Sequence, residues 1–221
     1  MAMGQFGIKE TTEKENIMNA ILLMTAAGLG LLAFFEPCTI ATHTLFAVRL
    51  SNEAVWRRRL ALAALVLSRA LLLMAIFGMA AWVGLDRIPT AIAMTMLSVI
   101  GAIYLISRRI YLPVPHIEFF RLIPGHARMS QAIKLGLTLP ACTLPLVLVV
   151  GVISALTQRP DTALLAGFIF AGMFSLPTLW DSTHKLDAAH RAFLGKAANL
   201  SPYITTLLLW SGAFMIWQTG V

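Results

Sequence analysis

The five residues Glu36-Pro37-Cys38-Thr39-Ile40 lie inside an apolar run that covers residues 17–48, and Glu36 is the only charged side chain of that run. A continuous helix of about 32 residues would be about 48 Å long, whereas a hydrocarbon core of about 30 Å needs only ~20 residues. Pro37 lacks a backbone N–H and therefore removes a hydrogen bond near the middle of such a helix. This stretch predicts a membrane helix that is broken next to Cys38.

A second stretch, Leu139-Pro140-Ala141-Cys142-Thr143-Leu144-Pro145, interrupts the apolar run of residues 132–156 in the same way. Pro140 and Pro145 break the helix there. The chain has two cysteines, and each is followed by a threonine, Thr39 or Thr143. Broken backbone at membrane depth is tolerated only where protein or water satisfies the freed polar groups. We therefore expect both breaks to face one interior site.

The composition indicates a polytopic membrane protein. Of the 221 residues, 58% are hydrophobic and 12% are charged, whereas a soluble domain has about 25% charged residues. So much apolar surface cannot be hidden inside a soluble globule of this length, which excludes a soluble enzyme, a disordered tail and a disulfide-rich secreted module. The pattern predicts one all-α membrane domain, residues 1–221, with six transmembrane helices at about 17–48, 60–84, 89–107, 131–156, 162–183 and 200–219.

The distribution of Lys and Arg predicts how these helices are oriented. Four of the 17 cations lie on the side of the N-terminus, twelve lie on the opposite side, and Arg69 lies within a helix. Because cytoplasmic loops carry the excess of positive charge, we expect a multi-pass protein of the cell inner (cytoplasmic) membrane with both termini outside the cytoplasm. Residues 1–16 are then an extracytoplasmic tail, and residues 108–130 are a cytoplasmic loop. This topology and contact with the lipid bilayer explain the net charge of +7, and we expect no nucleic-acid partner.

The two halves of the chain have the pattern of an inverted repeat. Each half, about 17–107 and about 131–221, contains three predicted helices, and the first of these is broken by proline beside a Cys-Thr pair. Three crossings are an odd number, so the second half is inserted in the opposite direction to the first. In such folds the functional site lies near the midplane at the interface of the repeats. This arrangement would bring Cys38 and Cys142 together.

Two cysteines in a membrane cavity are suited to thiol–disulfide exchange, in which a thiolate attacks a disulfide sulfur. The pair can accept two electrons from a dithiol on one side of the membrane and deliver them to a disulfide on the other. The breaks provide half-helix N-termini, whose partial positive charge favours thiolate. The alternative interpretation is a pair of buried structural cysteines that behave as small hydrophobic side chains.

With these motifs, Pro37-Cys38 and Cys142-Thr143-Leu144-Pro145, the sequence resembles the CcdA family, the small six-helix relatives of the membrane domain of DsbD. The resemblance covers essentially the whole chain. It implies transfer of electrons from cytoplasmic thioredoxin, the donor, to an extracytoplasmic thioredoxin-like protein, the acceptor, through a reversible Cys38–Cys142 disulfide. No cofactor takes part, and the family's usual clients serve cytochrome c maturation, periplasmic disulfide reduction or the maturation of redox enzymes. This chain differs in having no second proline shortly after Cys38 and in placing Glu36 where a small residue is more usual.

Three polar residues of the predicted helices are candidates for a supporting role beside the prolines and threonines of the motifs. Glu36 and Arg69 are costly to insert, at ~3 kcal/mol for an ionised group at the bilayer centre, and such groups usually pair or line water. Glu36 either pairs with Arg69 or accepts a proton beside Cys38. Alternatively, Arg69 extends toward the cluster Arg57–Arg59. His43 either tunes the thiol or shuttles protons, or it bonds to a neighbouring backbone group.

Two other classes of function remain open. Cys38, His43, Cys142 and the methionine sulfurs are soft ligands, which fits a copper-like soft-metal-ion transporter. The chain lacks a Cys-x-x-Cys motif and a dense His/Asp run in its first helix, both of which such a transporter would favour. The third class is a non-catalytic membrane assembly subunit that holds a redox partner. No haem, flavin or nucleotide motif is present in the sequence.

Overall fold

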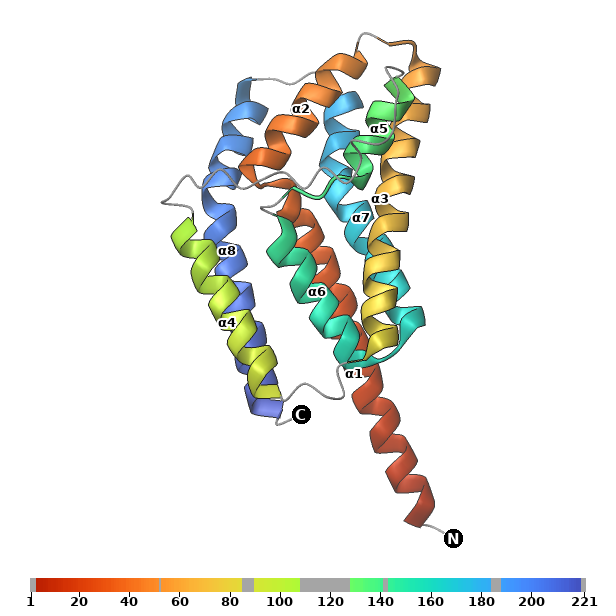
Figure 1. The fold of residues 1–221 in the computed structure, drawn as a ribbon, viewed down its shortest axis with the longest axis vertical. Helices are drawn as coiled ribbons and strands as arrows, with labels where there is room; N and C mark the ends of the chain where they lie inside the picture. Colours follow the sequence, from red (N-terminus) through yellow and green to blue (C-terminus); the bar gives the residue numbers. More distant parts are fainter. Residues whose placement is uncertain are drawn as a thin grey trace.

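The computed structural model describes residues 3–51, 53–84, 90–107, 128–140, 143–183 and 188–219, and all regular secondary structure in these ranges is helical (Figure 1). The predicted all-α class is thus confirmed for the described part of the chain. The helices in these ranges are α1 (Met3–Phe34), α2 (Pro37–Ser51), α3 (Val55–Val83), α4 (Thr90–Ser107), α5 (Arg128–Leu137), α6 (Leu144–Thr157), α7 (Pro160–Thr183) and α8 (Ala188–Thr219).

Three of these helices are long and apolar enough to cross a membrane. The segments are Asn16–Phe34 in α1, Val55–Val83 in α3 and Pro160–Trp180 in α7, and shorter apolar segments lie in α4 and α6. Large apolar side chains are exposed on the outside of the bundle, including Leu71 on α3 and Phe168 on α7. Such a surface suits contact with hydrocarbon rather than water, so the structure suggests insertion into a membrane.

The helix boundaries differ from the predicted segments in several places. The predicted segment 17–48 is divided between α1 and α2. The predicted tail, residues 1–16, is helical from Met3 onward and forms the first part of α1. This part of α1 extends away from the bundle in Figure 1. The predicted segment 200–219 is the second part of the longer helix α8. Of the predicted loop 108–130, only the part from Arg128 onward, where α5 begins, lies within the described residues.

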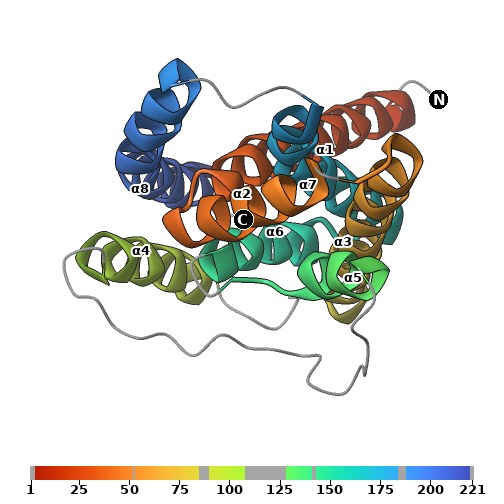
Figure 2. The ribbon, with the colours of Figure 1, turned by 90° about the horizontal axis from the view of Figure 1, so that it is seen from above.

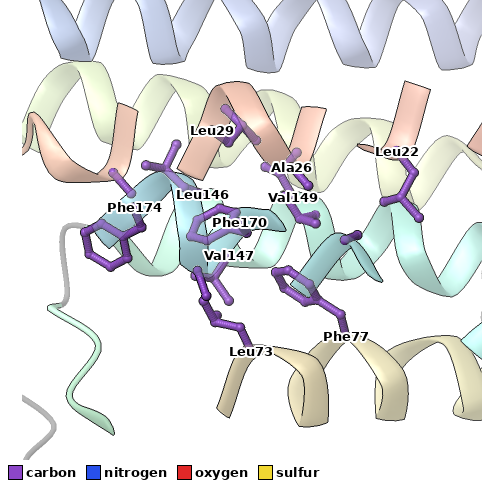
Figure 3. Close-up of a cluster of buried hydrophobic side chains, with 14 of the residues drawn as sticks. Leu22, Ala26, Leu29, Leu73, Phe77, Leu146, Val147, Val149, Phe170 and Phe174 are labelled. Carbon is purple, nitrogen blue, oxygen red and sulfur yellow. The ribbon is translucent and has the colours of Figure 1, made fainter. Parts of the chain in front are cut away.

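Helices α1, α3, α6 and α7 form the centre of the bundle. Helix α7 packs against α1 and α3, α6 also contacts both of them, and α4 and α8 pack against each other at one side (Figure 2). Their buried apolar faces meet in one cluster, part of which is shown in Figure 3. The ring of Phe170 lies edge-on to Phe77 at a centroid distance of 5.9 Å and edge-on to Phe174 at 6.2 Å. These rings join α7 to α3 in the interior.

Two glycines allow the central helices to approach closely. A Cβ atom at Gly30 of α1 would lie 2.6 Å from the carbonyl oxygen of Phe170 in α7. A Cβ atom at Gly167 of α7 would lie 2.7 Å from the backbone nitrogen of Met74 in α3. Because these neighbouring atoms belong to the backbone and cannot rotate aside, any larger residue at either position would push the helices apart. The close packing of α1, α7 and α3 therefore depends on these glycines.

The predicted break at Pro37 is confirmed. Helix α1 ends at Phe34, and α2 begins at Pro37, where the absent N–H costs no helical hydrogen bond. The N–H of Phe35 donates to the carbonyl of Leu32 at 2.9 Å, and the carbonyl of Glu36 accepts from the N–H of Ile40 at 2.9 Å. The last bond closes the first turn of α2, so Cys38 is the second residue of that helix.

The predicted break in the second half is also confirmed. Helix α5 ends at Leu137, and α6 begins at Leu144 with Thr143 as its N-cap and Pro145 in its first turn. In Figure 1 the chain ascends through α1 and α2 and descends through α5 and α6. The two broken segments therefore run in opposite directions along the bundle.

Candidate functional site

The first break is tied to α8 by the side chain of Glu36. This side chain is 3% exposed, and its Oε1 accepts a hydrogen bond of 3.2 Å from the hydroxyl of Ser201. Ser201 is itself buried and lies in the middle of α8. A carboxylate is therefore held inside the bundle, two residues before Cys38 in the chain.

His43 lies one helical turn after Thr39 in α2, and both nitrogens of its ring have a hydrogen-bond partner. Nδ1 lies 2.9 Å from the carbonyl oxygen of Thr39, and Nε2 lies 2.8 Å from Nη2 of Arg69. A carbonyl oxygen only accepts and a guanidinium only donates. Nδ1 must therefore carry the hydrogen and Nε2 must carry the lone pair, which means that these partners select the neutral Nδ1–H form of His43.

Aromatic rings hold the imidazole of His43 in place. Its ring centroid lies 6.0 Å from that of Phe34, the last residue of α1, and 5.6 Å from that of Phe174 in α7. Only 1% of His43 is exposed. The imidazole thus lies between the end of α1 and α7, next to the first break.

Arg69 of α3 is completely buried, and its guanidinium meets groups from three other helices, α2, α5 and α7. Nη1 donates to the hydroxyl of Ser175 at 3.0 Å, Nη2 donates to His43, and the carbonyl oxygen of Leu135 lies 3.5 Å from Nη2. The guanidinium carbon lies 4.0 Å from the ring centroid of Phe174, a distance typical of a cation–π contact. Nε has no hydrogen-bond partner in the described part of the chain.

These contacts bear on the two predictions made for Arg69. Its partners within the described ranges are an imidazole, a hydroxyl and a carbonyl oxygen, whereas the bond shown for Glu36 is to Ser201. The structure therefore gives Arg69 partners other than Glu36. Its side chain also turns into the bundle, where these partners lie, rather than extending toward Arg57–Arg59.

The two threonines of the motifs take part in hydrogen bonds at the start of their helices. Thr143 donates from its N–H at 2.9 Å and from its hydroxyl at 2.8 Å to the carbonyl of Pro140. Both bonds lie directly before the first turn of α6. The carbonyl of Thr39 accepts from His43 and from the hydroxyl of Thr42, while the buried hydroxyl of Thr39 has no partner among the described residues.

The structure brings together some of the predicted site residues. His43 and Arg69 are in direct contact, and Thr39 joins them through its carbonyl. Cys142 lies outside the described residues, and for Pro37 and Cys38 only the backbone, as the start of α2, is described. Within the described ranges, no group of three or more His, Cys, Asp or Glu side chains is arranged to hold a metal ion.

Sequence reasoning missed Ser175, Phe174 and Ser201. Ser175 is one of several hydroxyl residues of α7 and lies two residues before the helical Pro177. That proline removes a backbone hydrogen bond and so marks a polar position in α7. This signal could have drawn attention to Ser175, but no local signal connects it to Arg69.

No family model, curated protein or solved structure matches this chain. The function proposed for it therefore depends on its own residues and their geometry.

Proposed function

We propose that this chain is a thiol–disulfide electron transporter of the cell inner membrane and that Cys38 and Cys142 form its redox pair. One observation carries the proposal: each cysteine stands where a helix starts after a proline break. Cys38 is the second residue of α2, and Cys142 directly precedes Thr143, the N-cap of α6. These are the two cysteines of the chain.

The start of a helix is a favourable position for a reactive thiol. Its first N–H groups have no helical partner, and the helix dipole places a partial positive charge there. Cysteines at helix N-termini accordingly have a stabilised thiolate, which is the nucleophile in disulfide exchange. Two buried structural cysteines would gain nothing from these positions.

The proposed cycle moves two electrons across the membrane. A thiolate of cytoplasmic thioredoxin attacks the Cys38–Cys142 disulfide, and a mixed disulfide forms while one thiol of the chain is released. The second thiol of thioredoxin then closes its own disulfide, so thioredoxin is oxidised and both cysteines are reduced. The same two steps in reverse pass the electron pair and the protons to the disulfide of an extracytoplasmic thioredoxin-like protein.

The proposal includes the membrane arrangement expected from the sequence. This arrangement has six transmembrane segments in two inverted repeats, with both termini outside the cytoplasm. The opposite directions of α1–α2 and α5–α6 in Figure 1 support it, and so does the excess of Lys and Arg in the predicted cytoplasmic segments. Its clients are proteins of cytochrome c biogenesis or of related redox-protein maturation.

The test is a thiol-trapping assay on membranes that contain the full chain. Proteins are alkylated with a maleimide that adds a visible mass, before and after addition of reduced thioredoxin. We expect no label before reduction and two labels afterwards, because the chain has two cysteines. Cys38→Ser and Cys142→Ser are matched variants, and each is expected to take up one label regardless of the redox conditions.

Two results would contradict the proposal. If both cysteines are labelled before reduction, they form no disulfide. If neither is labelled after reduction, they are inert structural residues. In the first case, binding of Cu(I) to the purified chain becomes the next measurement, because the soft-metal transporter is then the stronger alternative.

A further inference from the structure

A continuous chain of hydrogen bonds connects α3 to the first turn of α2. Nη2 of Arg69 lies 2.8 Å from Nε2 of His43, and Nδ1 of His43 lies 2.9 Å from the carbonyl oxygen of Thr39. Thr39 directly follows Cys38 in that turn. The chain of hydrogen bonds therefore ends at the carbonyl of Thr39, the residue that follows the proposed redox cysteine.

This chain of bonds has a fixed direction. The guanidinium can only donate and the carbonyl can only accept. The bond from Arg69 to Nε2 therefore polarises the neutral imidazole and strengthens its Nδ1–H bond to the carbonyl of Thr39 in α2. A second imidazole proton would place a hydrogen between Nε2 and a guanidinium that offers no lone pair. The positive charge of Arg69 consequently raises the electrostatic potential at the start of α2, and His43 itself carries no charge.

The surrounding helices hold this chain of bonds in place. Ser175 and the ring of Phe174 in α7 fix the guanidinium, and Phe34 at the end of α1 lies against the imidazole. Both His43 and Arg69 are buried. A charge in such surroundings is poorly screened and acts over a longer distance than it would in water.

We propose that Arg69 and His43 are positioning residues of the redox site, a role that depends on the function proposed above. Together they hold the first turn of α2 against α3 and supply a fixed positive charge that favours the thiolate of Cys38. Neither residue exchanges electrons or forms a bond with a substrate. Their contribution is to favour ionisation of the Cys38 thiol, because the thiolate is the nucleophile in disulfide exchange.

The charged and titratable groups near this turn come from three parts of the described chain. His43 lies on α2, Arg69 lies on α3, and Glu36 lies in the break, where it is bonded to Ser201. Helices α5 and α7 contribute the carbonyl of Leu135 and the hydroxyl of Ser175, which do not titrate. A change in the pH response of Cys38 after substitution of Arg69 or His43 would therefore report on these two residues.

The experiment measures how fast Cys38 is alkylated by N-ethylmaleimide, from neutral to alkaline pH, in full-length protein carrying Cys142→Ser. Cys38 is then the only thiol. In Arg69→Met we expect the pH midpoint of alkylation to rise by about one unit, a roughly tenfold slower reaction at neutral pH, because the stabilising charge is lost. His43→Leu is expected to move the midpoint in the same direction, since leucine neither accepts from Arg69 nor donates to Thr39.

Two further variants separate this role from a merely structural one. In His43→Gln the amide oxygen can still accept from Arg69, so we expect the midpoint to return toward that of the reference. Arg59→Gln removes an exposed cation ten positions earlier in α3 and should leave the midpoint unchanged. A variant that merely loses stability is recognised by a smaller amount of protein in the membrane, which is measured alongside the midpoint.

Each outcome decides the proposal. Equal midpoints in the reference, Arg69→Met and His43→Leu would overturn the positioning role, even if the trapping assay shows a redox pair. If Arg69→Met does not accumulate in the membrane, the comparison of His43→Leu with His43→Gln decides in the same way. If Cys38 is not alkylated at any pH in the reference, the proposed function fails, and the positioning role fails with it.

Discussion

At the scale of single residues, Arg69 is the most unusual feature of the chain. It is a guanidinium without exposed surface in a helix that is apolar enough to cross a membrane. The cost of placing a charge there is offset by hydrogen bonds to His43 and Ser175 and by the face of Phe174. These partners come from other helices, so the buried charge also fixes how α2, α3 and α7 meet.

The hydroxyl of Ser175 should matter for stability because it accepts from Arg69 inside the bundle. We expect Ser175→Ala to lower the free energy of unfolding by about 1–3 kcal/mol, since a buried charged donor loses its acceptor. Ser211→Ala is the matched control: that hydroxyl is exposed on α8 and bonds only to its own helix, so its effect should stay within about 0.5 kcal/mol. The measurement is reversible denaturation in detergent micelles, and equal effects of the two substitutions would contradict the interpretation.

At the scale of helices, the prolines decide where the broken segments start. Pro37 is tolerated as the first residue of α2 and Pro145 as the second residue of α6, because neither position needs its N–H for a helical bond. Inside a continuous helix the same residues would remove a bond and clash with the preceding turn. Each proline therefore selects the start of a new helix, and the cysteine of its motif lies beside that start.

The contact of α1 with α7 can be tested with two glycines that are two positions apart. In Gly30→Ala the new Cβ would overlap the backbone of Phe170, and we expect a loss of about 1–3 kcal/mol of stability. In Gly28→Ala the new Cβ would meet nothing within 4 Å, so a small gain of up to about 1 kcal/mol is expected from helix propensity. The same denaturation assay compares them. Similar losses in both variants would mean that this part of α1 needs flexibility rather than close packing.

At the scale of the whole molecule, the number of membrane crossings decides the topology. Among the residues that the structure describes, three helices are long and apolar enough to cross a membrane, and three crossings would place the termini on opposite sides. The six crossings that we propose would place both termini on the same side. The position of the C-terminus is therefore a decisive measurement.

We expect a reporter enzyme that is active only outside the cytoplasm to be active when fused after residue 221. The same reporter inserted into the predicted loop 108–130 should be inactive, because that loop carries cations on the cytoplasmic side. A fluorescent protein that folds only in the cytoplasm is the complementary control and should give the opposite pattern. An inactive C-terminal fusion together with cytoplasmic fluorescence would contradict six crossings.

The sequence alone determined the helical class, the apolar character of the chain and the positions of both breaks. These features follow from composition and from the backbone chemistry of proline, which act over a few residues. The sequence also singled out Glu36, His43 and Arg69, because polar groups are expensive in an apolar helix. The redox pair is a prediction from sequence patterns and remains one for the assay to test.

The partners of those polar residues were decided only by the tertiary structure. Arg69 bonds to His43, 26 positions away, and to Ser175, 106 positions away, while Glu36 meets Ser201 across 165 positions. A charged side chain in an apolar interior bonds to whichever acceptor the packed helices bring within reach. The sequence around that side chain therefore does not predict its partner. A pairing with Arg69 was one of the two roles that the sequence left open for Glu36, and the packing of α2, α3 and α7 gives the guanidinium other acceptors.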